Sequence, residues 1–160
     1  MLFEDSSYSF RVAVSREAVA QMFGLCREFR HCETGGILIG SYSIDLSLAH
    51  VEEATSPPKD SRFGKNWFLR GTDGLEELLR NRWDKESRAH YLGEWHFHTR
   101  NVPSPSPQDK KQMREVARSG QYDCAEPILL IVFPERTGRL SISCFVFPVG
   151  TSYRTLHILD

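Results

Sequence analysis

Two histidines separated by one residue, His96 and His98, have the spacing that best suits a metal ion in this 160-residue chain. Alternate side chains of a strand share a face, so both imidazoles are expected on one side and Trp95 and Phe97 on the other. Asp109 follows at the start of a predicted helix and could supply a third, anionic ligand. Two histidines and a carboxylate leave one tetrahedral zinc position for water, which is the catalytic rather than the structural pattern. A His-x-His pair on a strand is also often incidental, so these residues allow both a hydrolytic Zn²⁺ site and a histidine pair without a ligand role.

Such a site also needs a carboxylate that takes a proton from the attacking water and hands it to the leaving group. Glu94 lies two residues before His96 and shares its face, whereas Glu33 directly precedes a glycine-containing apolar run. Spacing alone does not choose between these two glutamates. The run Ser106-Pro107-Gln108-Asp109 is also simply a good helix start, with a serine N-cap and proline in the first turn, and this interpretation is compatible with a metal site.

The surrounding pattern predicts helices mixed with hairpin-connected strands. Apolar residues at helical spacing favour helices over 15–30, 73–88 and 106–119, and Asp73 and Glu76 have capping-box spacing in the second. Short apolar runs favour strands over 35–40, 46–54, 91–98, 127–133 and 140–147. A loop is expected over 56–68, and the last ten residues carry no clear signal. We expect an α/β or α+β sandwich with a mixed sheet in one domain over 1–160.

The stretch from His98 to Ser106 completes the pattern H-x-H-x7-S-x-x-D, which resembles the motif of the JAMM/MPN metalloproteases, also called JAB domains. That family shares an upstream glutamate at the start of a glycine-containing strand, which Glu33-Thr34-Gly35-Gly36 resembles. The resemblance extends over most of the chain. It implies a single-domain JAB/MPN fold of the α/β class, with a mixed, curved β-sheet flanked by helices and similar to cytidine deaminases.

The resemblance also implies roles for individual residues. The family's Zn²⁺ ligands fall on His96, His98 and Asp109, its general base falls on Glu33, and the serine that helps to stabilise the oxyanion falls on Ser106. Only this resemblance favours Glu33 over Glu94 as the base.

Two positions depart from the family's pattern. Phe97 stands between the histidines, where Ser or Thr is usual, but it faces away from the metal in a strand, so ligation should survive. Thr99 replaces the usual proline after the second histidine, which is expected to loosen the loop 99–105 near the substrate groove. The departures therefore bear on substrate preference more than on activity.

The family's enzymes commonly cleave an isopeptide or peptide bond after the C-terminal tail of ubiquitin or a ubiquitin-like protein. This chain is most similar to the compact prokaryotic members, in particular the JAB isopeptidases encoded beside cGAS-like nucleotidyltransferases in bacterial antiphage (CBASS) systems. The implied partner is a nucleotidyltransferase joined to another molecule through its C-terminus. The alternatives are a protease that trims a sulfur-carrier protein, a hydrolase of a small peptide-like metabolite, and a non-catalytic MPN scaffold, which typically lacks the ligands retained here.

Residues near 56–68 allow two interpretations. Lys59, Arg62, Lys65 and Arg70 could meet an acidic partner, but a solvated basic loop explains them somewhat better. Trp67 and Phe68 are either a partner surface or anchors to the core.

Composition excludes several other classes of protein. Twenty Lys and Arg against 21 Asp and Glu give a formal net charge of -1, without the basic excess of a polyanion-coating protein. The longest apolar run is far short of the roughly 20 residues that span a bilayer, and the acidic N-terminus lacks signal-peptide features. We expect no nucleic-acid or membrane partner and a cytoplasmic location. The cysteines form no C-x-x-C pair and are expected to be reduced, with Cys26 and Cys144 in the core.

Overall fold

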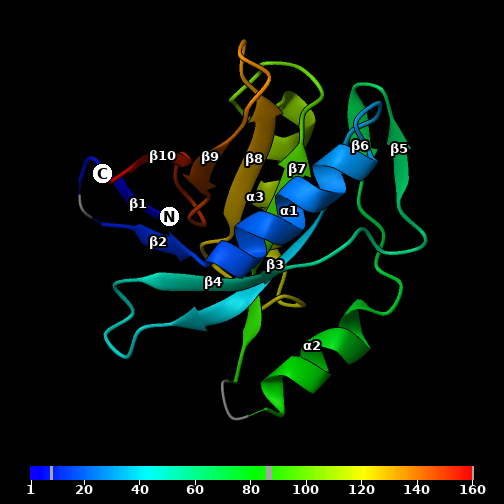
Figure 1. Cartoon of the computed structure of the whole chain (residues 1–160). Coiled ribbons are helices and arrows are strands. Elements are labelled where there is room, and N and C mark those ends of the chain that lie inside the picture. Colours follow the sequence, from blue (N-terminus) through cyan, green and yellow to red (C-terminus); the bar gives the residue numbers. More distant parts are fainter. Residues whose placement is uncertain (8, 86–87, 160) are drawn as a thin grey trace.

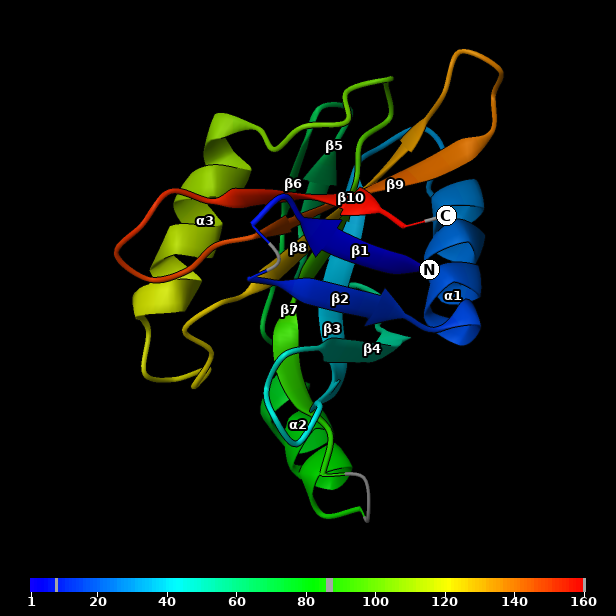
Figure 2. The same ribbon diagram turned by 90° about the vertical axis from the view of Figure 1, so that its left-hand side faces the viewer.

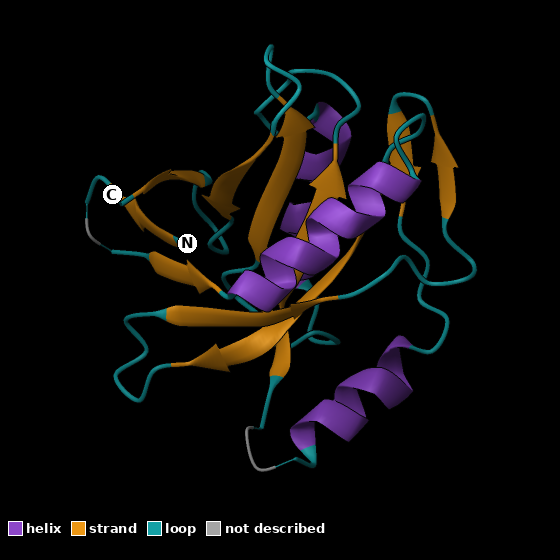
Figure 3. Cartoon of the chain, viewed as in Figure 1, coloured by secondary structure: helices purple, strands orange, loops and turns teal. Residues whose placement is uncertain are grey.

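The computed structural model describes residues 1–7, 9–85 and 88–159. Its main sheet is a closed, mixed barrel in the order β1-β10-β9-β8-β7-β3-β4-β2, and β5 and β6 form a separate two-stranded sheet (Figure 1). The strands are β1 (Leu2–Asp5), β2 (Arg11–Val14), β3 (Thr34–Tyr42), β4 (Ala49–Ala54), β5 (Arg62–Gly64), β6 (Trp67–Leu69), β7 (His90–Phe97), β8 (Ile128–Pro134), β9 (Leu140–Val146) and β10 (Arg154–Ile158). Helices α1 (Arg16–Glu28), α2 (Leu75–Trp83) and α3 (Pro107–Arg118) flank the strands (Figure 3). No helix in the described residues is long and apolar enough to cross a membrane.

Strand β7 separates the apolar core from a polar outer face. It pairs antiparallel with β3 and parallel with β8, so both of its edges are hydrogen-bonded. Trp95 and Phe97 pack on the inner face with Met22 and Cys26 of α1. Glu94 and His96 alternate with them and contact Gln112 and Asp109 of α3. Figure 2 shows α1 and α3 on opposite sides of the strands. The predicted alternation of β7 side chains is confirmed.

The predicted helices α1 and α3 are confirmed nearly to their ends, but the predicted start of α2 is wrong. Gly74, with φ 75°, is the N-cap of α2, and no side chain caps this helix. The Asp60 carboxylate instead accepts the backbone N–H groups of Thr72 and Asp73 at 3.0 and 2.9 Å, so a distant loop residue organises the entry. Helix α2 also ends at Trp83 rather than at 88, and residues 86–87 of the predicted helix lie outside the described residues.

The predicted mixed, curved sheet flanked by helices is confirmed, whereas its closure into a barrel was not predicted. Closure depends on β1, β2 and β10, which are only four or five residues long. Such short segments contain too few alternating apolar and polar residues to be recognised as strands in the sequence. Strand β4 begins at Ala49 rather than at 46, after a turn in which Leu46 has φ 58°. The predicted loop 56–68 contains β5 and the start of β6. The likeness to cytidine deaminases stays a prediction.

Reactivity of the cysteines provides a first test of this packing. All four are free thiols, and burial raises the pKa of Cys26 to about 12 and that of Cys124 to about 11. Cys144 is also buried, but Cys32 is half-buried. We expect iodoacetamide to alkylate Cys32 first in the folded protein, because the thiolate is the reactive form and the other thiols are held neutral and covered. Intact-mass kinetics should lose this first adduct in Cys32→Ser, and rapid alkylation of Cys26 in that variant would contradict the packing described.

Candidate active site

Strand β7 and the residue that follows it present both histidines of the motif on one side. The backbone N–H of His98 donates to the carbonyl of Val132 at 2.9 Å, which continues the pairing with β8 beyond the end of β7. Alternation therefore extends from His96 to His98, and both side chains are buried.

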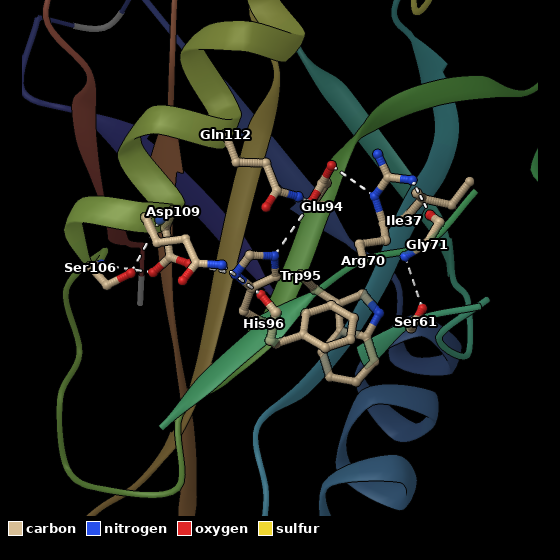
Figure 4. Close-up of polar contacts among 12 residues, drawn as sticks. Ile37, Ser61, Arg70, Gly71, Glu94, Trp95, His96, Ser106, Asp109 and Gln112 are labelled. Carbon is tan, nitrogen blue, oxygen red and sulfur yellow. Dashed lines mark hydrogen bonds and ion pairs between the residues drawn. The ribbon is translucent and has the colours of Figure 1, made fainter. Parts of the chain in front are cut away.

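The start of α3 fixes Asp109 against these two imidazoles. The Asp109 N–H donates to Oγ of Ser106 at 3.1 Å, and the Asp109 carboxylate accepts the Ser106 N–H at 2.7 Å, which makes a capping box. The same carboxylate contacts Nδ1 of His96 at 2.8 Å (Figure 4). It also lies 3.3 Å from Nε2 of His98. The helix start and the histidine pair are thus joined through one carboxylate.

The chemistry of this donor set fits zinc. Nδ1 of His98 lies 2.9 Å from the carbonyl of Val102, which can only accept, so Nδ1 donates there and Nε2 is the ring nitrogen that faces Asp109. Two imidazole nitrogens and an anionic carboxylate therefore converge. Within residues 1–7, 9–85 and 88–159, no group of three or more His, Cys, Asp and Glu side chains is already arranged as a complete metal site.

Charges within the cluster shift the pKa of each member. Burial alone would lower the pKa of His96, but hydrogen bonds to Asp109 and Glu94 outweigh it and raise this pKa to about 9. Burial would also lower the pKa of His98, but the hydrogen bond to Asp109 outweighs it, so the pKa of His98 is raised. Hydrogen bonds from both imidazoles hold the pKa of Asp109 far below its ordinary value in spite of burial. Asp109 therefore stays anionic, as a metal ligand must.

Glu33 lies at the same end of the sheet as His98. The pairing of β3 with β7 puts Thr34 opposite Phe97, and Glu33 directly precedes Thr34. The Glu33 N–H donates to the carbonyl of Gly64 at 2.9 Å, which holds this residue against β5. Partial burial raises the pKa of Glu33, nearby His98 opposes the rise, and nearby Asp109 adds to it. A carboxylate with a raised pKa beside His98 and Asp109 suits a proton acceptor.

Glu94, the other candidate base, is closed in by the protein. It is completely buried, and its oxygens accept hydrogen bonds from Arg70 at 2.9 Å, Gln112 at 2.5 Å and Tyr91 at 3.3 Å. Nε2 of His96 also lies 3.3 Å from Oε2 of Glu94. The two nitrogens of the His96 ring therefore face different carboxylates: Nδ1 faces Asp109 and Nε2 faces Glu94. This enclosure favours Glu33 as the group that meets a substrate water.

A family model described as prokaryotic homologs of the JAB domain matches residues 15–144, a range that contains every residue of this cluster. The chain belongs to the JAB family. A relative from Enterobacter hormaechei subsp. hoffmannii (strain UCI 50), named CD-NTase/cGAS isopeptidase, is 40% identical over 148 residues, which cover 92% of this chain and 81% of the relative.

A second relative and a solved structure are also similar to this JAB domain. A protein of the same name from Pseudomonas aeruginosa (strain BWHPSA011 / Pa011) is 35% identical over 88 residues, which cover 54% of each chain. The solution structure of a Desulfitobacterium hafniense protein superposes with a TM-score of 0.61 at 18% identity, over 90% of this chain and 88% of that one. At this identity the structure supports the fold alone.

Phe68 forms one wall of the JAB site. Its ring meets His96 edge-on with centroids 5.5 Å apart, and its side chain is 4% exposed. Gly35 makes this contact possible, because a Cβ there would lie 2.2 Å from the carbonyl oxygen of Trp95 and 2.8 Å from the Phe68 ring. Phe68 is therefore a core anchor, while neighbouring Trp67 is 46% exposed.

Arg70 was missed as part of the site. The sequence grouped it with a basic loop that could meet an acidic partner, but its side chain is 4% exposed and pairs with Glu94. Lys59, Arg62 and Lys65 are exposed, as predicted for that loop. No sequence pattern marks Arg70, since the chain must fold before the residue after β6 reaches β7.

Gln112 was also missed, and here a signal existed. It lies three residues after Asp109, so both project from one face of α3.

The loop 99–105, which was expected to be loosened by Thr99, is held at its start because the Thr99 hydroxyl donates to the carbonyl of Lys65 at 3.0 Å.

Proposed function

We propose that this JAB domain is a zinc-dependent isopeptidase that cleaves the bond after the C-terminal tail of a conjugated cGAS-like nucleotidyltransferase in antiphage defence. The observation that carries the proposal is the convergence of His96 and His98 on Asp109 beside Glu33. The names of the two isopeptidase relatives support the substrate class.

The residues divide the chemistry among them. His96, His98 and Asp109 would hold the zinc ion, which when bound lowers the pKa of a water and polarises the scissile carbonyl. Glu33 takes the proton of the attacking water and delivers it to the departing amine. The Ser106 oxygen already accepts the Asp109 N–H, which leaves its hydroxyl hydrogen to donate toward the developing oxyanion.

The short β5–β6 hairpin gives the tail a place to bind. An extended tail would add as a strand along an edge of this two-stranded hairpin, with backbone hydrogen bonds supplying affinity. The hairpin lies next to the site, because Gly64 at the end of β5 accepts the Glu33 N–H and Phe68 of β6 packs on His96. Exposed Arg62 and Lys65 would attract an acidic substrate.

A panel of tail fusions tests the proposal. Zinc-loaded protein is incubated with a reporter joined to the C-terminus of a cGAS-like nucleotidyltransferase, of a ubiquitin-like protein and of a sulfur-carrier protein. We expect cleavage after the nucleotidyltransferase tail, loss of cleavage on chelation, and recovery when Zn²⁺ is restored, because the donor set fits this ion. Mass spectrometry of the products locates the cleaved bond.

His96→Ala provides the control for this panel, since it removes one ligand. It should cleave no fusion at any zinc concentration that saturates the wild type. Cleavage of the sulfur-carrier fusion alone would transfer the proposal to that substrate class. A zinc-loaded protein that cleaves no tail would overturn the isopeptidase proposal.

A further inference from the structure

Glu94 is the centre of a buried polar cluster that the chemistry above does not use. Its Oε1 accepts a hydrogen bond from Nε of Arg70, and its Oε2 accepts from the Gln112 amide and faces Nε2 of His96 (Figure 4). The hydroxyl of Tyr91 also donates to Oε1. The side chain of Glu94 has no exposed surface, and that of Arg70 is 4% exposed. A buried carboxylate is costly unless it is paired and hydrogen-bonded, and this one is both.

The position of Arg70 is itself fixed by its surroundings. Its Nη1 donates to the carbonyl of Gly71 at 2.8 Å and its Nη2 donates to the hydroxyl of Tyr122 at 2.8 Å. The Gly71 N–H in turn donates to Oγ of Ser61 at 3.0 Å, which closes the loop that carries the β5–β6 hairpin. The Arg70 guanidinium is therefore held in place by its own hydrogen bonds, and it fixes the orientation of the Glu94 carboxylate.

Every neighbour of the Glu94 oxygens is a hydrogen-bond donor, and this has a consequence for His96. An ionised carboxylate only accepts hydrogen bonds, so Nε2 of His96, which faces Oε2 at 3.3 Å, must carry a proton to bond to it, as the NH₂ group of Gln112 does. A proton on Nε2 leaves Nδ1 as the ring nitrogen that faces Asp109 at 2.8 Å. The cluster thus selects which nitrogen of His96 is available to a metal.

We propose that Glu94, locked by Arg70, is a positioning residue that holds the Nε2–H of His96 and so presents Nδ1 to the zinc site. It acts through His96 and touches neither substrate nor metal. The proposal rests on the proposed function for the identity of the metal, but the hydrogen bond itself belongs to the folded protein with or without zinc.

Glu94→Gln is the decisive variant. A glutamine here has one oxygen and one NH₂ group in place of the two carboxylate oxygens. The charged Arg70 keeps the oxygen as its acceptor, so the NH₂ group takes the place of Oε2 and faces the Nε2–H of His96, donor against donor. Glu94→Asp is the second variant, because it keeps the charge opposite Arg70 and the fold while its shorter side chain cannot span from Arg70 to His96. Glu115→Gln, an exposed carboxylate on α3, is the matched control.

We expect both Glu94 variants to lower zinc affinity by about 10–100-fold in chelator competition, the range for loss of an outer-shell partner. At saturating zinc, kcat should fall while KM stays unchanged, because Glu94 is completely buried and does not touch substrate. The slowly exchanging Nε2–H NMR signal of His96 should be present in the wild type, metal-free and zinc-loaded, and lost from Glu94→Gln. Glu115→Gln should match the wild type in all three measurements.

Folded Glu94 variants with wild-type zinc affinity and an unchanged Nε2–H signal would overturn the proposal. Should Glu94→Gln not fold, Glu94→Asp alone decides by the same measurements. A wild type that cleaves no tail would overturn the proposed function only, since zinc affinity and the NMR signal are read without substrate. A wild type that shows no protected Nε2–H would overturn the positioning role even if the enzyme is active.

Discussion

Replacing Glu33 by glutamine is expected to lower kcat/KM for tail cleavage by about 10²–10⁴-fold, the usual contribution of a positioned proton acceptor. Glutamine keeps the shape of the side chain and the backbone contact to Gly64, so the fold should be retained. The variant should also bind zinc as tightly as the wild type, because Glu33 is not among the predicted ligands. Chelator competition and steady-state kinetics on the nucleotidyltransferase fusion measure the two effects separately.

The contrast with Glu94 makes this prediction specific. Glu33→Gln should lose catalysis with zinc affinity intact, whereas Glu94→Gln should lose zinc affinity and only part of kcat. Full activity in Glu33→Gln, together with an inactive but zinc-saturated Glu94→Gln, would assign the base to Glu94 instead. The burial of Glu94 behind His96 argues against that result.

The convergence of His96, His98 and Asp109 could be predicted from the sequence because local rules place these residues. Strand alternation puts His96 and His98 on one side, and a serine N-cap with proline after it starts α3 at the position that presents Asp109. Both rules act over a few residues and do not depend on the rest of the fold. Glu33 needed the family resemblance, because its approach to His98 depends on how β3 pairs with β7.

The parts that were missed depend on long-range contacts. Arg70 reaches Glu94 only because the loop after β6 folds back onto β7, and Asp60 replaces Asp73 at the start of α2 for the same kind of reason. The closing strands β1 and β10 pair with each other across nearly the full length of the chain. Side-chain type and spacing along the sequence contain no signal for such pairings, so the barrel and the cluster behind His96 became visible only in three dimensions.

Asp109 joins two functions that a pair of substitutions can separate. Asp109→Asn keeps a side-chain oxygen that can accept the Ser106 N–H, so the capping box is retained, but it removes the negative charge between the two imidazoles. We expect zinc affinity to fall by more than the roughly 10–100-fold that loss of an outer-shell partner costs, and tail cleavage to be abolished. Asp109→Ala should show the same loss of zinc and also unfold more easily, by about 1 kcal/mol relative to Asp109→Asn, because the side-chain half of the capping box, which accepts the Ser106 N–H, is lost as well.

Ser106→Ala completes this comparison, since it removes the other half of the cap without touching a ligand. Its metal-free form should lose about 1 kcal/mol of unfolding free energy in urea, the typical cost of an N-cap, while its zinc affinity stays that of the wild type. Stability therefore follows the helix cap and zinc affinity follows the charge of Asp109, although one carboxylate serves both. Wild-type zinc binding by Asp109→Asn would place the metal elsewhere and remove the basis for the hydrolytic site.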